Sequence, residues 1–284
     1  MQLVIMSAGI GSRFGGLKQL EPIDDAGNFI INYSIFQANH AGFDEIILVI
    51  NPADKSEFDK KIKKKVGAKI RYAFQTSNLK NSPKTRKKPW GTAHALVCAK
   101  RYITQNFAVI NADDFYGQNA FLTASKMLKN FAKLDCGLVA YKLEKTLNQN
   151  ATYKRGICQT KSNILTNICE CEVRQTGSKF FAKNLLDATE VSVDKNTKTS
   201  MNFWCFTPKI FDVLLPKFFE KYNQILTQNP LDGEVFLPVL ISELTHQNIL
   251  SPKIKITSSE CFGITHKSDL EFVKLKIKKL SQKH

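Results

Sequence analysis

The chain opens with an apolar run that leads directly into a glycine-rich turn carrying two cations. Gly9 and Gly11 let backbone N–H groups approach an anion closely, and Arg13 and Lys18 add positive charge behind them. A dinucleotide-binding fingerprint is excluded because Phe14 occupies the position of its third glycine. A Walker A loop is excluded because the lysine comes too late and no hydroxyl residue follows it. The remaining pattern predicts a turn that binds a triphosphate.

Two adjacent carboxylates, Asp113 and Asp114, follow another apolar run at 107–110. Neighbouring carboxylates at the end of a buried strand are unfavourable unless a cation or hydrogen-bond donors compensate their charge. Magnesium is commonly held by one or two carboxylates together with the phosphates of a substrate. We therefore predict Asp113 as a Mg²⁺ ligand, and Asp114 as either a helix cap or a residue that supports the ligand.

A third segment is typical of a pocket for a flat ring. Gln75 ends an apolar strand, and Gly91 and Thr92 begin the next helix. Small residues at a helix start leave room for a ring to lie against the backbone, whose amides can then read its edge. His94 is assigned no chemistry. The basic run at 80–88 is interpreted either as a solvated loop or as a guide for an anionic substrate, and both interpretations stay open.

The elements between these segments have to bring them together. Apolar runs typical of buried strands alternate with helical patterns through the first half of the chain. Strands are predicted at 3–8, 46–50, 70–74, 107–110 and 138–141, and helices at 31–41, 55–66, 92–102 and 120–134. This alternation predicts right-handed βαβ units, whose ligands bind beyond the carboxyl ends of the strands. The predicted fold class is α/β, a three-layer α/β/α sandwich around a mostly parallel mixed sheet.

The pattern changes after residue 141. The segment 142–200 is rich in Lys, Asn, Thr and Gln and has only short strand patterns, which predicts a small β-rich excursion. Beyond it, the sequence predicts strands at 201–206 and 254–256, helices at 235–246 and 269–280, and a helix at 210–226 broken at Pro216. We expect one domain, 1–284, with a nucleotide-binding half at 1–141 and an acceptor-binding half at 142–284 that includes the C-terminal helix.

Composition restricts the class of protein further. Of the 284 residues, 43% are hydrophobic, which is enough for a full-sized core. The seven cysteines lack metal-binding spacing, so reduced thiols and a cytoplasmic location are expected. Without a signal-peptide pattern or a run of about 20 apolar residues, we expect no membrane partner. The net charge of +16 suits phosphorylated small molecules, and no nucleic-acid partner is expected because no basic helix carries interleaved aromatic residues.

Taken in order, the three segments resemble the sugar-phosphate nucleotidyltransferase superfamily, which includes NDP-sugar pyrophosphorylases and cytidylyltransferases. The resemblance is carried by the turn Gly9 to Lys18, by Gln75 with Gly91-Thr92-Ala93, and by Asn111-Ala112-Asp113-Asp114. It extends to about residue 117 and is thinner beyond that point. The resemblance implies a Rossmann-like nucleotidyltransferase fold and an Mg²⁺-dependent enzyme of NDP-sugar biosynthesis.

The resemblance also implies a role for each matched residue. The residues implied to bind the nucleotide are Ala8, Gly9, Gly11, Ser12, Arg13, Gln75, Gly91 and Thr92. Arg13 and Lys18 are implied as catalytic cations on the triphosphate, and Asp113 as the metal ligand. The residues implied to contact the acceptor are Arg155, Gly156, Glu170, Asn202 and Glu234. A late metal carboxylate found in many relatives has no clear counterpart, since Thr265 stands where some have Asp and Asp269 can simply support the last helix.

The predicted reaction joins a nucleoside triphosphate, preferably a pyrimidine nucleotide, to a sugar 1-phosphate and releases pyrophosphate. A phosphate monoester has a second pKa of about 6 and is a dianion near neutral pH, so the reaction needs no general base. One alternative is a cytidylyltransferase that acts on a non-sugar phosphate such as an alditol phosphate or phosphocholine. Another is a catalytically weak, nucleotide-binding regulator. The acceptor and the oligomeric state are not specified by the sequence.

Overall fold

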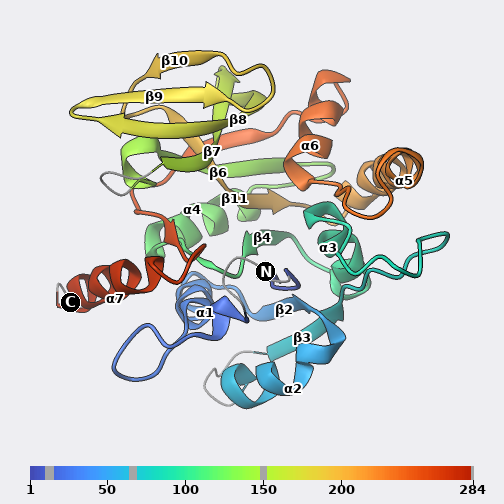
Figure 1. Ribbon diagram of the computed structural model, residues 1–284, viewed down its shortest axis with the longest axis horizontal. Helices are drawn as coiled ribbons and strands as arrows, with labels where there is room; N and C mark the ends of the chain where they lie inside the picture. The colour runs from blue at the N-terminus through green and yellow to red at the C-terminus, as the bar shows by residue number, and fades with distance from the viewer. Residues whose placement is uncertain (10–15, 64–68, 148–151, 283–284) are drawn as a thin grey trace.

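The computed structural model describes residues 1–9, 16–63, 69–147 and 152–282 of the chain. At its centre, β1 (Gln2–Met6) pairs in parallel with both β2 (Glu45–Ile50) and β4 (Phe107–Asn111). A further parallel strand, β3 (Lys69–Phe74), lies beside β2. Figure 1 shows these strands in the centre and lower part of the molecule. The parallel pairing confirms the arrangement predicted for the first half of the chain.

The second half extends the same sheet, mainly with antiparallel strands. β11 (Lys198–Phe206) lies antiparallel between β4 and β6 (Cys136–Lys142), while β12 (Lys253–Ile256) runs parallel to β6. The strands of the predicted excursion are β7 (Thr152–Lys161), β8 (Ile164–Thr176), β9 (Lys179–Asn184) and β10 (Glu190–Val193). They are longer than the sequence indicated, and only β7, β8 and β9 bury residues, which are interspersed with exposed ones along each of the three strands.

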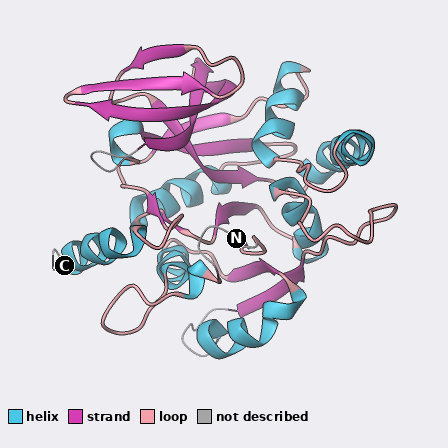
Figure 2. Ribbon diagram, in the orientation of Figure 1, coloured by secondary structure: helices cyan, strands magenta, loops and turns pink. Residues whose placement is uncertain are grey.

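Helices cover both faces of the sheet, as Figure 2 shows. Along β1, Leu3 and Ile5 pack with α1 (Ile30–His40) and α4 (Gln118–Lys129), whereas Val4 faces the opposite layer. That layer consists of α3 (Thr92–Ala99), α5 (Ile210–Gln228) and α6 (Leu237–His246). Side chains alternate between the two faces of a strand, so one apolar strand contributes to both cores. These layers confirm the predicted α/β class.

The predicted break at Pro216 is wrong, because α5 continues through it. Leu214 and Phe218, on either side of the proline, are fully buried in the core. Packing of this apolar face holds the helix together despite the backbone hydrogen bond that proline cannot donate.

The surface helix predicted at 55–66 consists of α2 (Lys55–Phe58) and a further helical turn, Asp59–Lys63. Its last three predicted residues fall outside the described part of the chain. The last helix, α7 (Asp269–Ser281), follows the prediction closely. Within the described ranges, no helix has the length and apolarity needed to cross a bilayer.

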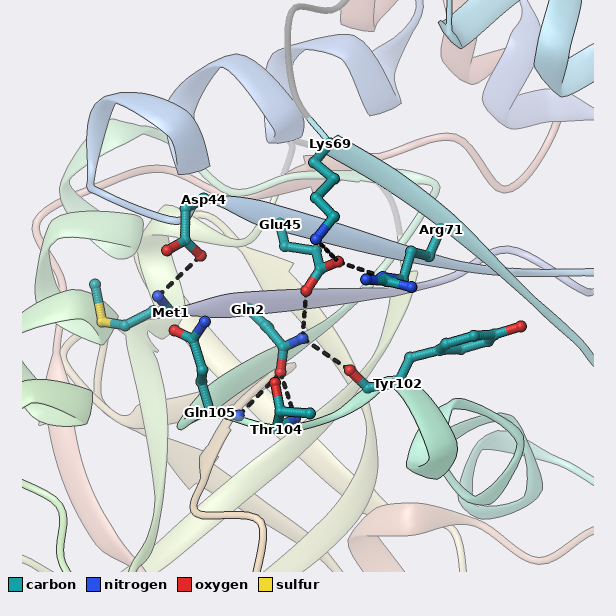
Figure 3. A network of polar contacts seen from close by, with 9 residues as sticks. All are labelled: Met1, Gln2, Asp44, Glu45, Lys69, Arg71, Tyr102, Thr104 and Gln105. Atoms are coloured by element: carbon teal, nitrogen blue, oxygen red, sulfur yellow. Dashed lines mark hydrogen bonds and ion pairs between the residues drawn. The ribbon is translucent and has the colours of Figure 1, made fainter.

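A polar network closes the amino ends of the parallel strands (Figure 3). The side-chain nitrogen of Gln2 donates to Glu45 at 2.6 Å and to the backbone oxygen of Tyr102 at 2.8 Å. Arg71 and Lys69 also pair with the Glu45 carboxylate, the lysine at 3.1 Å. Burial alone would raise the pKa of Glu45, but these donors outweigh it and lower that pKa to about 2. The network therefore ties β1, β2 and β3 together at the end of the sheet opposite their carboxyl ends.

Candidate active site

A cleft of about 740 Å³ opens at the carboxyl ends of β1, β3 and β4. The predicted nucleotide-binding residues that line it are Ala8, Gly9, Gln75, Gly91 and Thr92. The predicted metal ligand Asp113 also lines it. Gly11, Ser12 and Arg13 fall outside the described residues. The sheet thus brings together the three segments singled out in the sequence, at the edge where parallel strands present ligand sites.

Lys18 and Asp113 meet at this edge of the sheet and form an ion pair between Nζ and Oδ2. Lys18 begins a short 3-10 helix, Lys18–Leu20, which is held under the end of β1 because Gln19 donates to the backbone oxygen of Ser7 at 3.2 Å. Asp113 follows β4, the neighbour of β1. Both side chains keep some access to solvent, 18% for the lysine and 29% for the aspartate. Asp113 lines the cleft, whereas Lys18 is not among the lining residues and lies beside the cleft through its ion pair with Asp113.

Asp114 has a different environment from Asp113. It begins β5 (Asp114–Phe115), which pairs antiparallel with β13 (Phe262–Gly263), and a Cβ on Gly263 would collide with its carboxyl oxygen. Asn111 donates to the same carboxyl group at 3.0 Å. Burial, followed by the charge of Asp113, raises the pKa of Asp114 to about 6. Asp114 is half-buried and held by Asn111, and the next helix begins only at Gln118, so its contacts match the supporting role rather than that of a helix cap.

The donor set around Asp113 suits magnesium held largely by its substrate. No group of three or more His, Cys, Asp or Glu side chains gathers anywhere in the described ranges, so the protein offers no closed metal cage there. A single accessible carboxylate beside a cleft that can hold substrate phosphates is an arrangement that Mg²⁺ accepts. The late segment does approach this place, since Ile264 donates its N–H to the backbone oxygen of Asp113 at 2.9 Å. Asp269, however, accepts from the N–H groups of Thr265 and His266, each at 2.7 Å, and so supports the start of α7.

The opposite wall of the cleft depends on a glycine at position 91. Gly91 has a φ of +88°, and a Cβ there would lie 2.5 Å from the backbone oxygen of Val235. Backbone bonds of 3.0 Å join Val235 to Trp90 and to Ala93, which hold the two segments in contact. The hydroxyl of Thr92 accepts the N–H of Leu237 at 2.9 Å. Only glycine combines the left-handed conformation with this close approach.

Arg86, within the basic run at 80–88, has a structural role. That role differs from both interpretations of the run, a solvated loop and a guide for an anionic substrate. Its guanidinium donates to the backbone oxygens of Lys88, Pro89, Pro230 and Gly233 at 2.7–2.9 Å. It also lies 3.5 Å above the ring of Trp90 and is only 4% exposed. Arg86 is therefore a buried brace for the cleft wall. No local pattern indicates this role, because in the sequence a buried arginine cannot be distinguished from the exposed lysines around it.

Glu234 lines the cleft together with the predicted nucleotide-binding residues, although the sequence resemblance assigned it to the acceptor. It pairs with Lys88 at 2.7 Å. Asn111 and Asp232 also line the cleft and were not singled out as site residues. Asn111 begins the segment Asn111-Ala112-Asp113-Asp114 that carries the resemblance, and Asp232 lies two residues before Glu234, so their neighbours in the sequence could have indicated them.

The other predicted acceptor residues gather on β7, β8 and β11. Gly156 pairs with Glu170 on one side and with Ser200 on the other. Asn202 lies two residues farther along β11, at an irregularity in the strand pairing, and has a φ of +59°. A β-bulge of this kind often re-aims side chains beside a site. Four of the five predicted acceptor residues, Arg155, Gly156, Glu170 and Asn202, thus form one group separate from the lining of the cleft.

Arg155 connects this group with the acidic end of β4. Its guanidinium donates to the backbone oxygens of Lys154 and Thr146, while its Nε is buried with no partner in the described part of the chain. Burial lowers the pKa of Arg155, and the nearby Cys261 and Asp114 oppose that shift. Desolvation raises the pKa of Glu170, although part of its side chain reaches solvent. An electrostatic interaction between Arg155 and Asp114 therefore links the predicted acceptor residues to the aspartates.

A profile of the nucleotidyl transferase family matches residues 2–162, more than half of the chain. The chain belongs to this family, which confirms the class of enzyme and the fold expected from the sequence. A curated relative is the bifunctional protein GlmU of Acetivibrio thermocellus, 23% identical over 226 residues. The alignment covers 76% of this chain and 45% of that protein, so the chain spans about half the length of the relative it matches.

Solved structures resemble the whole described fold. The inositol-1-phosphate CTP transferase from T. maritima superposes with a TM-score of 0.61 at 12% identity, covering 98% of this chain and 96% of that one. A structure from Bacillus anthracis, assigned as a glucose-1-phosphate thymidylyltransferase and solved in complex with sucrose, also gives 0.61 at 12% identity, with 97% and 94% coverage. At this identity the two structures support the fold, including that of the second half, and leave the substrate open.

Proposed function

We propose that this protein transfers a nucleotidyl group from a pyrimidine nucleoside triphosphate to the phosphate of a small acceptor, with a sugar 1-phosphate as the favoured acceptor. The observation that carries the proposal is the ion pair between Lys18 and Asp113 at a cleft bordered by Gln75 and Gly91. A cation for phosphate, a carboxylate for a metal and a slot for a flat ring are thereby offered to one ligand.

In the proposed reaction, an oxygen of the acceptor phosphate attacks the α-phosphorus in line with the bond to pyrophosphate. The new O–P bond forms as the bond to the leaving oxygen breaks, and pyrophosphate departs with that electron pair. The attacking dianion carries no proton, so no side chain has to act as a base. Lys18 stabilises charge on the triphosphate oxygens. Arg13, with Gly11 and Ser12, is proposed as the rest of the triphosphate turn on the basis of the sequence resemblance.

The same proposal gives Asp113 the role of metal ligand. Its accessible carboxylate would hold Mg²⁺ together with the substrate phosphates. A bound ion supplies neutralising charge to the triphosphate. The present partner of Asp113 is Lys18, whose ammonium lies where this carboxylate and a phosphate could share it. Asn111 and the backbone of Ile264 orient the surrounding acidic segment.

The acceptor is proposed to bind beside the aspartates, on β7, β8 and β11. Arg155 offers a cation for its phosphate, and Glu170 and Asn202 offer hydrogen-bond acceptors for hydroxyl groups. Gly156 is closely packed, since a Cβ there would lie 2.8 Å from the Ile168 side chain and 3.3 Å from the Glu170 carboxylate, so glycine is what lets these neighbours approach the strand. Under this proposal, residues 1–141 form the nucleotide-binding half and residues 142–284 the acceptor-binding half of one domain.

A second candidate is a cytidylyltransferase that acts on a non-sugar phosphate. The likeness in fold to an inositol-1-phosphate CTP transferase makes this candidate specific. It would use the same Lys18 and Asp113 and differ in the base and the acceptor.

The test is to incubate the full chain and Mg²⁺ with UTP, dTTP, CTP, ATP and GTP, each combined with sugar 1-phosphates, alditol phosphates and phosphocholine. Pyrophosphate release and the mass of the new product are measured. We expect a diphosphate-linked pyrimidine product, and a CTP-specific product from a non-sugar phosphate would favour the second candidate. Nucleotide binding without any product across the panel would support the regulator instead. Turnover only with ATP or GTP would contradict the pyrimidine assignment.

A further inference from the structure

Behind the cleft wall, α3 places His94 against the side chain of Gln75. Both side chains are buried, each 3% exposed. Gln75 Nε2 lies 2.9 Å from the backbone oxygen of Gly91 and 3.3 Å from His94 Nδ1. The sequence suggested no chemistry for His94, whereas its ring contacts the side chain proposed to read the nucleobase.

The backbone oxygen of Gly91 determines which end of the Gln75 amide faces it. A carbonyl oxygen only accepts hydrogen bonds, so the amide nitrogen has to lie on this side. The second hydrogen of the same nitrogen then points toward His94 Nδ1, which has to be the accepting nitrogen of the ring. Only Oε1 of Gln75 is left for a ligand. No donor within the described ranges pairs with Oε1, and Gln75 lines the cleft.

His94 is itself held on two sides. Its Nε2 lies 3.3 Å from the sulfur of Cys98, one turn along α3, and its ring stacks on Phe218 of α5 with centroids 5.8 Å apart. Burial, with the charge of Arg86 as a second cause, lowers the pKa of His94 to about 4. Burial raises the pKa of Cys98 to about 12. The ring is therefore neutral near pH 7, and Nδ1 keeps its lone pair for Gln75.

We propose that His94 is a positioning residue that makes Gln75 present a hydrogen-bond acceptor to the nucleobase, so that the bound base must donate an N–H to Gln75 Oε1. This inference rests on the proposed function, in which the cleft binds a pyrimidine nucleotide. Uracil and thymine offer their ring N3–H, and cytosine offers its exocyclic amino group. Without His94, the amide loses one of the two contacts that hold its orientation.

The first test compares natural and methylated nucleotides. Binding of UTP, 3-methyl-UTP, CTP and N4,N4-dimethyl-CTP to the full chain is measured by calorimetry. For the pyrimidine that binds, we expect the methylated analogue, which lacks the donor, to bind at least about tenfold more weakly. Equal affinity of both pairs would overturn the inference. Failure of both natural nucleotides to bind would overturn the proposed pyrimidine site instead, and the tautomer measurement below then decides the role of His94.

Two variants of His94 distinguish the effect of its hydrogen bond with Gln75 from steric exclusion of the methyl groups. His94→Leu removes the acceptor at Nδ1, while His94→Asn retains one, because the asparagine oxygen takes the place of Nδ1. We expect His94→Leu to raise the KM for the nucleotide about tenfold, with a smaller change in kcat, and to reduce the penalty of methylation. His94→Asn should resemble the unaltered protein. If His94→Asn behaves like His94→Leu, or if only kcat changes, the inference is wrong.

The matched control is His246→Leu, the same substitution at an exposed histidine at the end of α6. It should alter neither the nucleotide KM nor the methylation penalty.

A nitrogen NMR spectrum of the unaltered protein tests the same contact directly, and it covers the case in which His94→Leu fails to fold. We expect a neutral His94 ring with its proton on Nε2 and an unprotonated Nδ1. A proton on Nδ1 would require Gln75 to turn its oxygen inward and its NH₂ group toward the cleft. That result would overturn the inference whatever the nucleotide measurements give.

Discussion

At the amino ends of β1, β2 and β3, Glu45 is buried among donors that satisfy it, and Gln2 uses both ends of its amide. At the carboxyl ends of the same sheet, Asp113 and Asp114 lie side by side, and Lys18 pairs with the first of them. The two ends shift carboxyl pKa values in opposite directions, to about 2 for Glu45 and to about 6 for Asp114.

The same strands thus support two kinds of polar chemistry. A buried group whose partners are all present stabilises the fold, whereas a group that lacks compensation costs stability and stays available for a ligand. Within the described ranges, two buried polar atoms without partners, Ser7 Oγ and Arg155 Nε, lie toward the carboxyl end. The comparison therefore predicts that substitution of Lys18 or Asp113 at the carboxyl end chiefly changes turnover. Substitution of Glu45 at the amino end should chiefly change the free energy of unfolding.

The largest expected effect is on turnover, at the carboxyl end. Asp113→Ala and Lys18→Ala should each lower the rate of pyrophosphate release by about 10²–10⁴-fold, because each removes a charge from the proposed triphosphate site. The free energy of unfolding should change by less than about 1 kcal/mol, since the pair is partly exposed. Steady-state kinetics and urea unfolding measure the two quantities.

The control for that pair is Lys55→Ala, which breaks an exposed ion pair with Asp59 on a surface helix. It should leave turnover unchanged. Near-native turnover in both Asp113→Ala and Lys18→Ala would show that the difference between the two ends of the sheet is unrelated to catalysis.

A smaller effect, on stability and activity together, is expected at the cleft wall. Gly91→Ala should lower the free energy of unfolding by about 2 kcal/mol or more and reduce nucleotide binding, because its φ is +88° and its Cβ would meet Val235. Gly177→Ala is the matched control, since Gly177 has a φ of +60° with open space around it. Thermal unfolding should show a clearly smaller loss for Gly177→Ala. Equal losses would mean that the close approach to Val235 contributes nothing.

At the amino end, Glu45→Gln should destabilise the fold by about 1–2 kcal/mol at pH 7 without changing kcat. Glu45 has a lowered pKa when folded, so its contribution is present above its unfolded pKa of 4.5 and is lost as the pH falls toward about 2. The difference in unfolding free energy between Glu45→Gln and the unaltered protein should therefore shrink below pH 4.5. Glu190→Gln, which loses an exposed pair with Arg174, is the control and should cost less than about 1 kcal/mol. A drop in kcat for Glu45→Gln would contradict the separation of the two ends.

The smallest expected effect is at Asp114, whose contribution to stability depends on pH in the opposite sense to that of Glu45. The pKa of Asp114 is raised in the folded state, so its favourable contribution is present below 3.8 and is lost as the pH rises through about 6. Asp114→Asn should therefore gain about 1 kcal/mol relative to the unaltered protein between pH 5 and pH 7.5. Unfolding free energies of both proteins at the two pH values test this. A gain at pH 5 that disappears at pH 7.5 would reverse the assigned sign.

Much of the first half could be predicted from the sequence because its signals are local. The apolar runs of β1, β2 and β4 have no polar residue to interrupt them, and strand periodicity depends only on neighbouring residues. The same holds for Gly9, Gln75 and Asp113, which follow strand ends directly and line one cleft. The second half was harder to predict, since β8 alternates polar and apolar residues weakly and α5 continues through Pro216 by virtue of its packing.

The sequence by itself determined the family, the order of strands and helices in the first half, and the types of residue that meet at the end of β4. Only the tertiary structure decided that Arg86 is a buried brace, that Glu234 lines the same cleft as Gln75, and that His94 contacts Gln75. These roles depend on contacts between segments far apart in the chain. Residue type and spacing do not encode such contacts, because they form only when the sheet brings the segments together.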